Sequence, residues 1–92
     1  MKNIIINARR WFDHNDGNTY HSSDIFVDGE PIEGVKFAYG YGDHYEETAM
    51  EKLIEQHFIT DRDRHEALWR WCERNGVKLH RTVIDVSRKR DL

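Results

Sequence analysis

Two Asp-Gly dipeptides, at residues 16–17 and 28–29, place the strongest constraint on how this 92-residue chain folds. Both residue types tolerate positive φ angles, so Asp-Gly favours the tight turns that join antiparallel strands. The first dipeptide follows a strand-like run over residues 4–12, and a second such run spans residues 19–27. Alternating apolar residues resume over 31–39. The pattern predicts an antiparallel meander of three strands.

Two helices are expected after this meander. Asp43 is a good N-cap, and together with Glu46 it resembles a capping box that begins the first helix. Thr60 or Asp61 is expected to cap a second helix, which ends at the Asn75-Gly76 signal.

Residues 77–86 are rich in β-branched side chains and predict a fourth strand. Their apolar pattern changes phase, which indicates either a bulge near Arg81-Thr82 or a strand covered on both faces. The expected fold is α+β with the order βββααβ: an antiparallel β-meander of three strands, two helices packed on one face, and a C-terminal fourth strand. We expect residues 1–92 to form one domain, with a frayed tail at 88–92.

Cysteine content and hydropathy indicate the compartment. Cys72 is the single cysteine, so no intrachain disulfide can form. Only three consecutive apolar residues, 4–6, precede Asn7, which is too few for a signal peptide. No stretch is apolar enough to cross a membrane. We therefore expect a cytoplasmic protein with no membrane partner.

The sequence shows no constellation typical of an active site. None of the 6 histidines stands at a zinc-ligand spacing from another. Cys72 falls on the apolar side of the second helix, where a thiol usually packs as an inert side chain. Residues 40–42 lack the full glycine pattern of a nucleotide site, and Asp43 would repel a phosphate there. We expect no metal, no cofactor and no enzymatic activity.

The first predicted helix carries an acidic stripe, defined as Asp43, Glu47, Glu51 and Glu55. Like charges at this spacing destabilise a helix by roughly 0.2–0.5 kcal/mol per pair. One interpretation is a docking face for a partner with a basic surface. The other is a solvated face that only keeps the protein soluble.

Acidic residues are in excess in the first part of the chain, whereas basic residues are in excess in the second part. Residues 1–58 contain 5 Lys and Arg against 11 Asp and Glu, whereas residues 59–92 contain 9 against 6. An alternative nucleic-acid-binding site follows from the basic and aromatic residues of this half: Trp69, Arg70, Arg74 and Arg81. Interspersed acidic residues weaken this hypothesis, and Trp69 can equally pack between a helix and the sheet.

Three runs, at residues 7–13, 17–22 and 37–43, resemble short proteins encoded by bacteriophages and prophages. The resemblance covers about the first half of the chain. That family has no assigned activity, so it implies a setting, the bacterial cytoplasm during infection. The expected function is a phage-type protein-binding module that inhibits or modulates a host defence or nucleic-acid-handling factor. An exposed sheet edge leaves a homodimer open.

Overall fold

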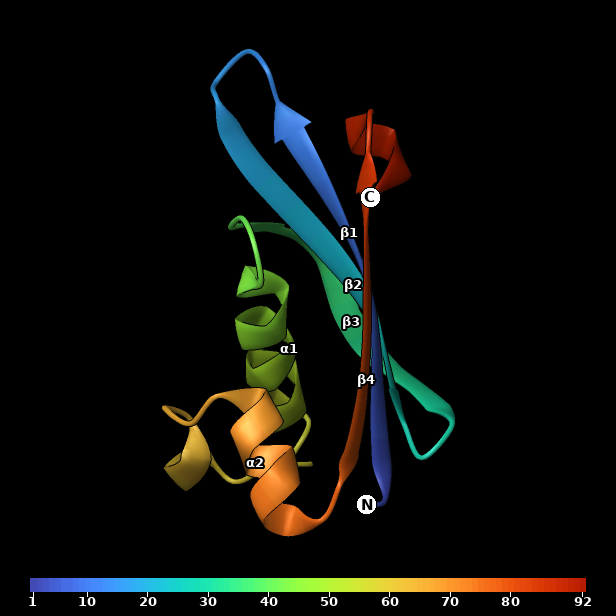
Figure 1. Cartoon of the computed structure of the whole chain (residues 1–92), viewed down its shortest axis with the longest axis vertical. Coiled ribbons are helices and arrows are strands. Elements are labelled where there is room, and N and C mark those ends of the chain that lie inside the picture. Colours follow the sequence, from blue (N-terminus) through green and yellow to red (C-terminus); the bar gives the residue numbers. More distant parts are fainter.

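The computed structural model describes residues 1–92 and confirms the α+β class and the order βββααβ. Its main elements are β1 (Asn3–Asp13), β2 (Asn18–Val27), β3 (Glu30–Tyr39), α1 (His44–Glu55), α2 (Leu68–Asn75) and β4 (Lys78–Val86). Two short 3₁₀ turns complete the chain, η1 (Asp61–Asp63) and η2 (Lys89–Asp91). Both α helices lie on one face of the sheet (Figure 1). No helix is both long and apolar enough to cross a membrane.

The four strands form one sheet in the order β3-β2-β1-β4. β2 pairs antiparallel with both β1 and β3, so the predicted meander is confirmed. β4 lies beside β1 and runs parallel to it, from Asn3 opposite Lys78 to Trp11 opposite Val86. The connection from β3 to β4 therefore has to cross the sheet, and α1 and α2 lie within this crossover (Figure 1).

Both explanations offered for the irregular apolar pattern of β4 are wrong. The register between β1 and β4 continues without a shift, so there is no bulge near Arg81-Thr82. Nor is the strand covered on both faces, because Ile84 is 58% exposed. Val83 packs against the core, whereas the neighbouring Ile84 points to the face without helices. The phase changes because apolar residues occupy both faces of a strand whose outer face is solvated.

The hydrophobic core fills the layer between the sheet and the helices. It contains 15 buried residues, including Ile4 and Ile6 from β1, Leu53 from α1 and Leu68 from α2. Alternation in β1 places Ile4, Ile6 and Ala8 on the covered face. Burial of such side chains contributes about 1.5–3 kcal/mol each, which makes this layer the main source of stability.

β3 is irregular where it pairs with β2. The register shifts between His21 and Ser23 and again between Ser23 and Ile25. Gly34 lies inside this irregular segment, and a Cβ atom at this position would collide with the carbonyl oxygen of Ser23. β3 can therefore approach β2 here only because residue 34 has no side chain.

Two expectations about helix ends need correction. Asp43 occupies the N-cap position of α1, but its side chain makes no capping hydrogen bond, and Glu46 contacts α2 instead. The second helix begins at Leu68 rather than after Thr60, because Asp61–Asp63 form the short turn η1, which Thr60 precedes. The C-terminal signal is confirmed, since Gly76 ends α2 in the left-handed conformation with φ 68°.

The face of the sheet without helices carries an aromatic row. The ring of Tyr20 stacks on Phe37 with 4.8 Å between centroids and on Trp11 with 5.9 Å. Residues 88–92, expected to be frayed, include the turn η2. Lys89 Nζ lies 5.0 Å from the Phe37 ring centroid, so this tail lies against the same face.

Candidate functional site

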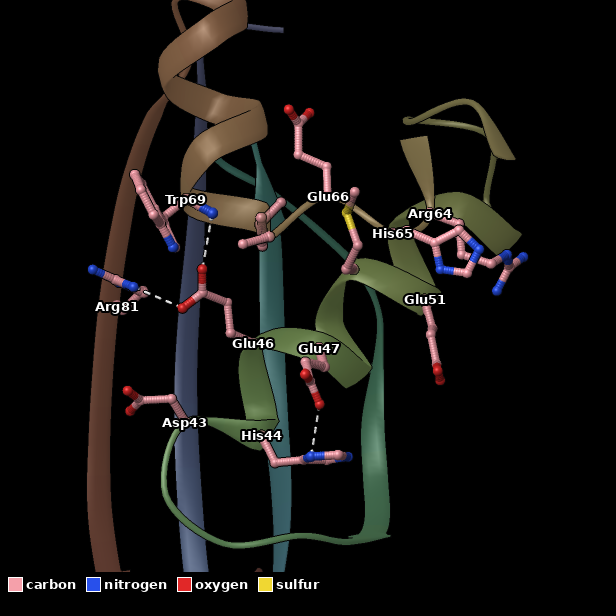
Figure 2. Close-up of a pocket in the computed structure, with 13 residues that line it drawn as sticks. Asp43, His44, Glu46, Glu47, Glu51, Arg64, His65, Glu66, Trp69 and Arg81 are labelled. Carbon is pink, nitrogen blue, oxygen red and sulfur yellow. Dashed lines mark hydrogen bonds and ion pairs between the residues drawn. The ribbon is translucent and has the colours of Figure 1, made fainter. Parts of the chain in front are cut away.

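A groove of about 810 Å³ opens beside the first half of α1. Its other walls come from the loop before α2, the start of α2 and one side chain of β4 (Figure 2). The lining residues are Asp43, His44, Glu46, Glu47, Met50, Glu51, Arg64, His65, Glu66, Ala67, Leu68, Trp69 and Arg81.

Three of the four residues of the acidic stripe line this groove: Asp43, Glu47 and Glu51. The Glu47 carboxylate contacts His44 Nδ1 at 2.7 Å, whereas Asp43 and Glu51 have no ion pair or side-chain hydrogen bond. Glu55 lies outside the groove, and its carboxylate is 3.3 Å from Lys52 Nζ. The structure therefore separates Glu55 from the other three acidic residues.

Glu46 has a different environment from the stripe, because its side chain is only 10% exposed. Its Oε1 accepts a hydrogen bond from the Trp69 backbone N–H at 2.9 Å, and its Oε2 accepts one from Arg81 Nη1 at 2.6 Å (Figure 2). This hydrogen bond raises the pKa of Arg81. One carboxylate from α1 thus satisfies a free N–H at the start of α2 and fixes a side chain of β4.

Sequence reasoning missed this role of Glu46 and treated it as part of a cap. A signal was present in its spacing, because Glu46 falls three residues before Ala49 and four before Met50. These positions belong to the buried side of α1. A carboxylate at a core-facing position needs a cationic or N–H partner. The spacing of Glu46 in the sequence therefore indicated a side chain with such a partner.

The structure divides the residues of the alternative nucleic-acid site. Trp69 and Arg81 line the groove, whereas Arg70 and Arg74 do not. Trp69 is 45% exposed, and the Arg70 guanidinium lies 5.2 Å from the centroid of its ring. Arg74 pairs with Glu66 at 2.8 Å, and Arg81 pairs with Glu46. Two of the four are therefore held by carboxylates of the same chain.

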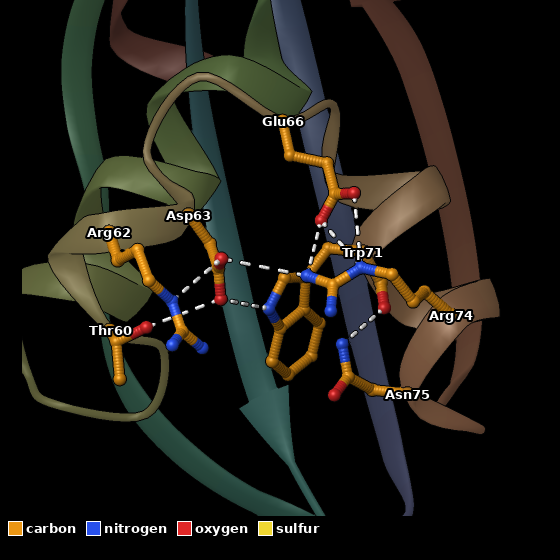
Figure 3. Close-up of polar contacts among 7 residues, drawn as sticks. All are labelled: Thr60, Arg62, Asp63, Glu66, Trp71, Arg74 and Asn75. Atoms are coloured by element: carbon orange, nitrogen blue, oxygen red, sulfur yellow. Dashed lines mark hydrogen bonds and ion pairs between the residues drawn. The ribbon is translucent and has the colours of Figure 1, made fainter.

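A network around Asp63 fixes the loop that forms one wall of the groove. Asp63 Oδ2 accepts hydrogen bonds from Trp71 Nε1 at 3.0 Å and from the Thr60 hydroxyl at 3.2 Å (Figure 3). The bond from Trp71 is the main reason that the pKa of Asp63 is lowered. Arg74 lies 3.5 Å from the same carboxylate and also holds Glu66. Arg64 and His65, which line the groove, lie between the two anchored residues Asp63 and Glu66.

The chemistry of the remaining polar groups is limited. No three His, Cys, Asp or Glu side chains come together in an arrangement that could hold a metal ion. Cys72 is buried, and burial raises its pKa to about 11, so this side chain is a neutral thiol near pH 7.

His21 is fully buried beneath the start of α1. Its Nδ1 lies 3.2 Å from the Gly40 carbonyl oxygen, which can only accept, so Nδ1 carries the proton and donates it. The single proton of the Thr48 hydroxyl is then directed to His21 Nε2, at 2.7 Å, rather than to the Tyr45 carbonyl oxygen at 3.2 Å. Burial is the main cause that lowers the pKa of His21, with a smaller contribution from His44. The neutral imidazole thus ties β2 to α1.

We expect the protein to lose stability on acidification because of His21. An unfolded histidine titrates near about 6.5, and the folded pKa is lower, so the unfolded chain binds more protons between the two values. Stability should therefore fall as the pH drops below about 6.5 and level off below the folded pKa. Urea unfolding at pH 7.5 and 5.5 measures this change. His21→Gln should reduce the change, whereas His80→Gln, at an exposed position, should not. Equal pH dependence in wild type and His21→Gln would contradict the assignment.

No protein family, no curated protein and no solved structure matches this chain. By its fold and its groove, the chain is a small α+β domain with an acidic groove between its two α helices.

Proposed function

We propose that this chain is a protein-binding module rather than an enzyme, and that its groove docks a basic segment of another protein. The observation that supports this most is the pair Asp43 and Glu51, which line the groove and form no ion pair in the chain, although the charge of Asp43 helps to raise the pKa of Arg81. Glu47 adds a third carboxylate, which contacts only His44. Charges repeated at this spacing weaken α1, so a partner that neutralises them would relieve this repulsion.

The net charge of the groove supports a basic partner. Five carboxylates line it, against two guanidinium groups. Both guanidiniums are paired with carboxylates, Arg81 with Glu46 and Arg64 with Asp61. Glu66 is likewise paired, with Arg74. The negative charge that remains comes from the acidic residues Asp43, Glu47 and Glu51. Such a field attracts Lys and Arg side chains, raises the association rate and weakens as salt is added.

The groove also offers apolar surface. Met50 and the half-exposed Trp69 lie in its wall, near the carboxylates. Lys and Arg side chains combine an aliphatic stem with a charged end, so they can use both kinds of surface at once. Trp69 is also a residue type that often anchors protein interfaces.

The setting follows from the resemblance to bacteriophage and prophage proteins. We propose that the partner is a host protein with a basic surface, such as a defence or nucleic-acid-handling factor, and that binding inhibits or modulates it. The chain would then act in the bacterial cytoplasm. Asp43, Glu47 and Glu51 would form the binding site, with Trp69 at its edge.

Charge reversal tests this function. We expect Glu47→Lys/Glu51→Lys to lose at least about tenfold in partner capture, since about 1.4 kcal/mol corresponds to tenfold and two attractive contacts become repulsive. The measurement is capture from nuclease-treated bacterial lysate by the tagged protein, quantified by mass spectrometry. Glu55→Lys is the matched control, because it makes a similar change on α1 outside the groove.

Two outcomes would contradict this proposal. A protein captured equally by wild type and by the double variant does not use the groove. Capture that disappears with nuclease would favour nucleic-acid binding, for which the exposed Trp69 and Arg70 are the best candidates. Arg74→Ala and Arg81→Ala are poor tests of that alternative, because both side chains pair within the chain.

A further inference from the structure

The two edges of the sheet differ in how well they are protected. The β3 edge contains Pro31, which has no N–H, and two register shifts beside Gly34. Such features discourage a further strand from pairing. β4 spans 9 residues with no proline, no glycine and no register shift. The β4 edge is therefore the regular, open edge of this sheet.

The direction of the backbone groups of β4 follows from one hydrogen bond. The Lys78 N–H donates to the Lys2 carbonyl at 3.0 Å, so the backbone groups of Lys78 point toward β1. Backbone groups alternate in direction along a regular strand, so those of every second residue point away from β1. The residues whose N–H and C=O groups face the open edge are Leu79, Arg81, Val83 and Asp85.

We propose that a second copy of the chain pairs with this edge, β4 antiparallel to β4, about a two-fold axis at Val83. In this register Arg81 of each copy lies opposite Asp85 of the other, so opposite charges meet twice. A two-fold axis at Arg81 would bring the two Arg81 side chains together. An axis at Thr82 would place Arg81 opposite Val83 and would form no charge pair between the two copies.

The side chains are accessible for this pairing. Asp85 is 77% exposed although it contacts Arg10, and Arg81 is 41% exposed although it contacts Glu46. On the outer face the proposed register sets Thr82 beside Ile84 of the other copy, which covers part of an exposed apolar side chain. The charges on β4 therefore select one register instead of preventing association.

The resulting dimer would have one continuous sheet, with four strands from each copy. A two-fold axis perpendicular to the sheet keeps all the helices on the same face. One strand pair forms a small interface, so we expect a weak dimer with a Kd of about 10–100 µM. This inference rests on β4 alone and does not depend on the proposed function.

The experiment combines analytical ultracentrifugation with amide hydrogen exchange measured by NMR. In dilute protein the Arg81, Val83 and Asp85 amides should exchange quickly, whereas the Thr82 amide, which faces β1, should be protected. At millimolar concentration the dimer should form, and these three edge amides should become protected as well. A monomer at millimolar concentration, or edge amides with unchanged exchange, would overturn the proposal.

Substitution at the two-fold axis adds a matched pair. Val83→Pro removes an N–H that faces the open edge, and Val83→Ala makes a similar loss of side-chain packing but retains that N–H. We expect Val83→Pro to raise the Kd at least about tenfold over that of Val83→Ala, in line with the loss of two central hydrogen bonds. Equal dimerisation of the two variants would overturn the proposal. Asp85→Arg, which places arginine opposite Arg81, should weaken the dimer even if Val83→Pro does not fold.

Discussion

Glu46→Ala should lower the free energy of unfolding by about 3 kcal/mol, the lower end of what breaking a buried ion pair costs, because Arg81 is partly solvated. The substitution leaves the Trp69 N–H at the start of α2 without its acceptor. It also frees the Arg81 guanidinium, whose carboxylate partner is 2.6 Å away in the wild type. Contacts from α1 to both α2 and β4 are lost together.

Urea unfolding measures this effect, and Glu47→Ala provides the control. Glu47 is the next residue of α1 and also lines the groove, but it is exposed. Its replacement should change the free energy of unfolding by less than about 0.5 kcal/mol. Glu46→Gln should retain the hydrogen bond from the Trp69 N–H and lose the charge attraction to Arg81. Its loss in free energy of unfolding should therefore fall between the losses for Glu46→Ala and Glu47→Ala. A cost for Glu46→Ala equal to that of Glu47→Ala would refute this role.

Gly34→Ala should also lower the free energy of unfolding by about 3 kcal/mol, at the upper end of what overpacking costs. The new Cβ would collide with the carbonyl oxygen of Ser23, and β2 cannot move away because it lies between β1 and β3. Relief requires β3 to separate from β2 near Val35, which is buried against the core face.

Gly42→Ala is the matched control for this substitution. Gly42 has φ +60°, but a Cβ there would meet no atom within 4 Å. Its replacement should therefore cost only the left-handed conformation, about 1 kcal/mol. Thermal or urea unfolding of the two variants separates steric collision from backbone strain. If Gly34→Ala and Gly42→Ala lower the free energy of unfolding equally, β3 relaxes around the new methyl group and the predicted collision is wrong.

The local parts of the fold could be predicted from the sequence because each rests on neighbouring residues. The Asp-Gly turns and the alternation in residues 4–8 define the meander, and Gly76 defines the end of α2. The pairing of β4 with β1 could not be predicted, because a strand's own pattern does not encode which edge it joins. The start of α2 was placed too early, because Thr60 is a good cap whose hydroxyl bonds Asp63 in a 3₁₀ turn instead.

The candidate site also has one part that local spacing predicted and another that depends on contacts between distant residues. Spacing on one helix predicted a single stripe of Asp43, Glu47, Glu51 and Glu55. The first three line one groove, whereas Glu55 lies outside it. That Trp69 and Arg81 share this groove depends on contacts across 23 and 35 residues of chain, made through Glu46. Periodicity gives no information about such distant contacts. The groove is therefore a property of the assembled fold, although its acidic wall is visible in the sequence.

The parallel pairing of β1 with β4 also sets the order of events during synthesis. As the chain leaves the ribosome, β1, β2 and β3 emerge in sequence and can pair with their neighbours. One edge of β1 then stays open until the helices and β4 have been made, since Lys78 must reach Lys2. Of the four strands, β1 is thus the first to be synthesised and the last to have both edges paired, so one of its edges stays open until β4 has emerged.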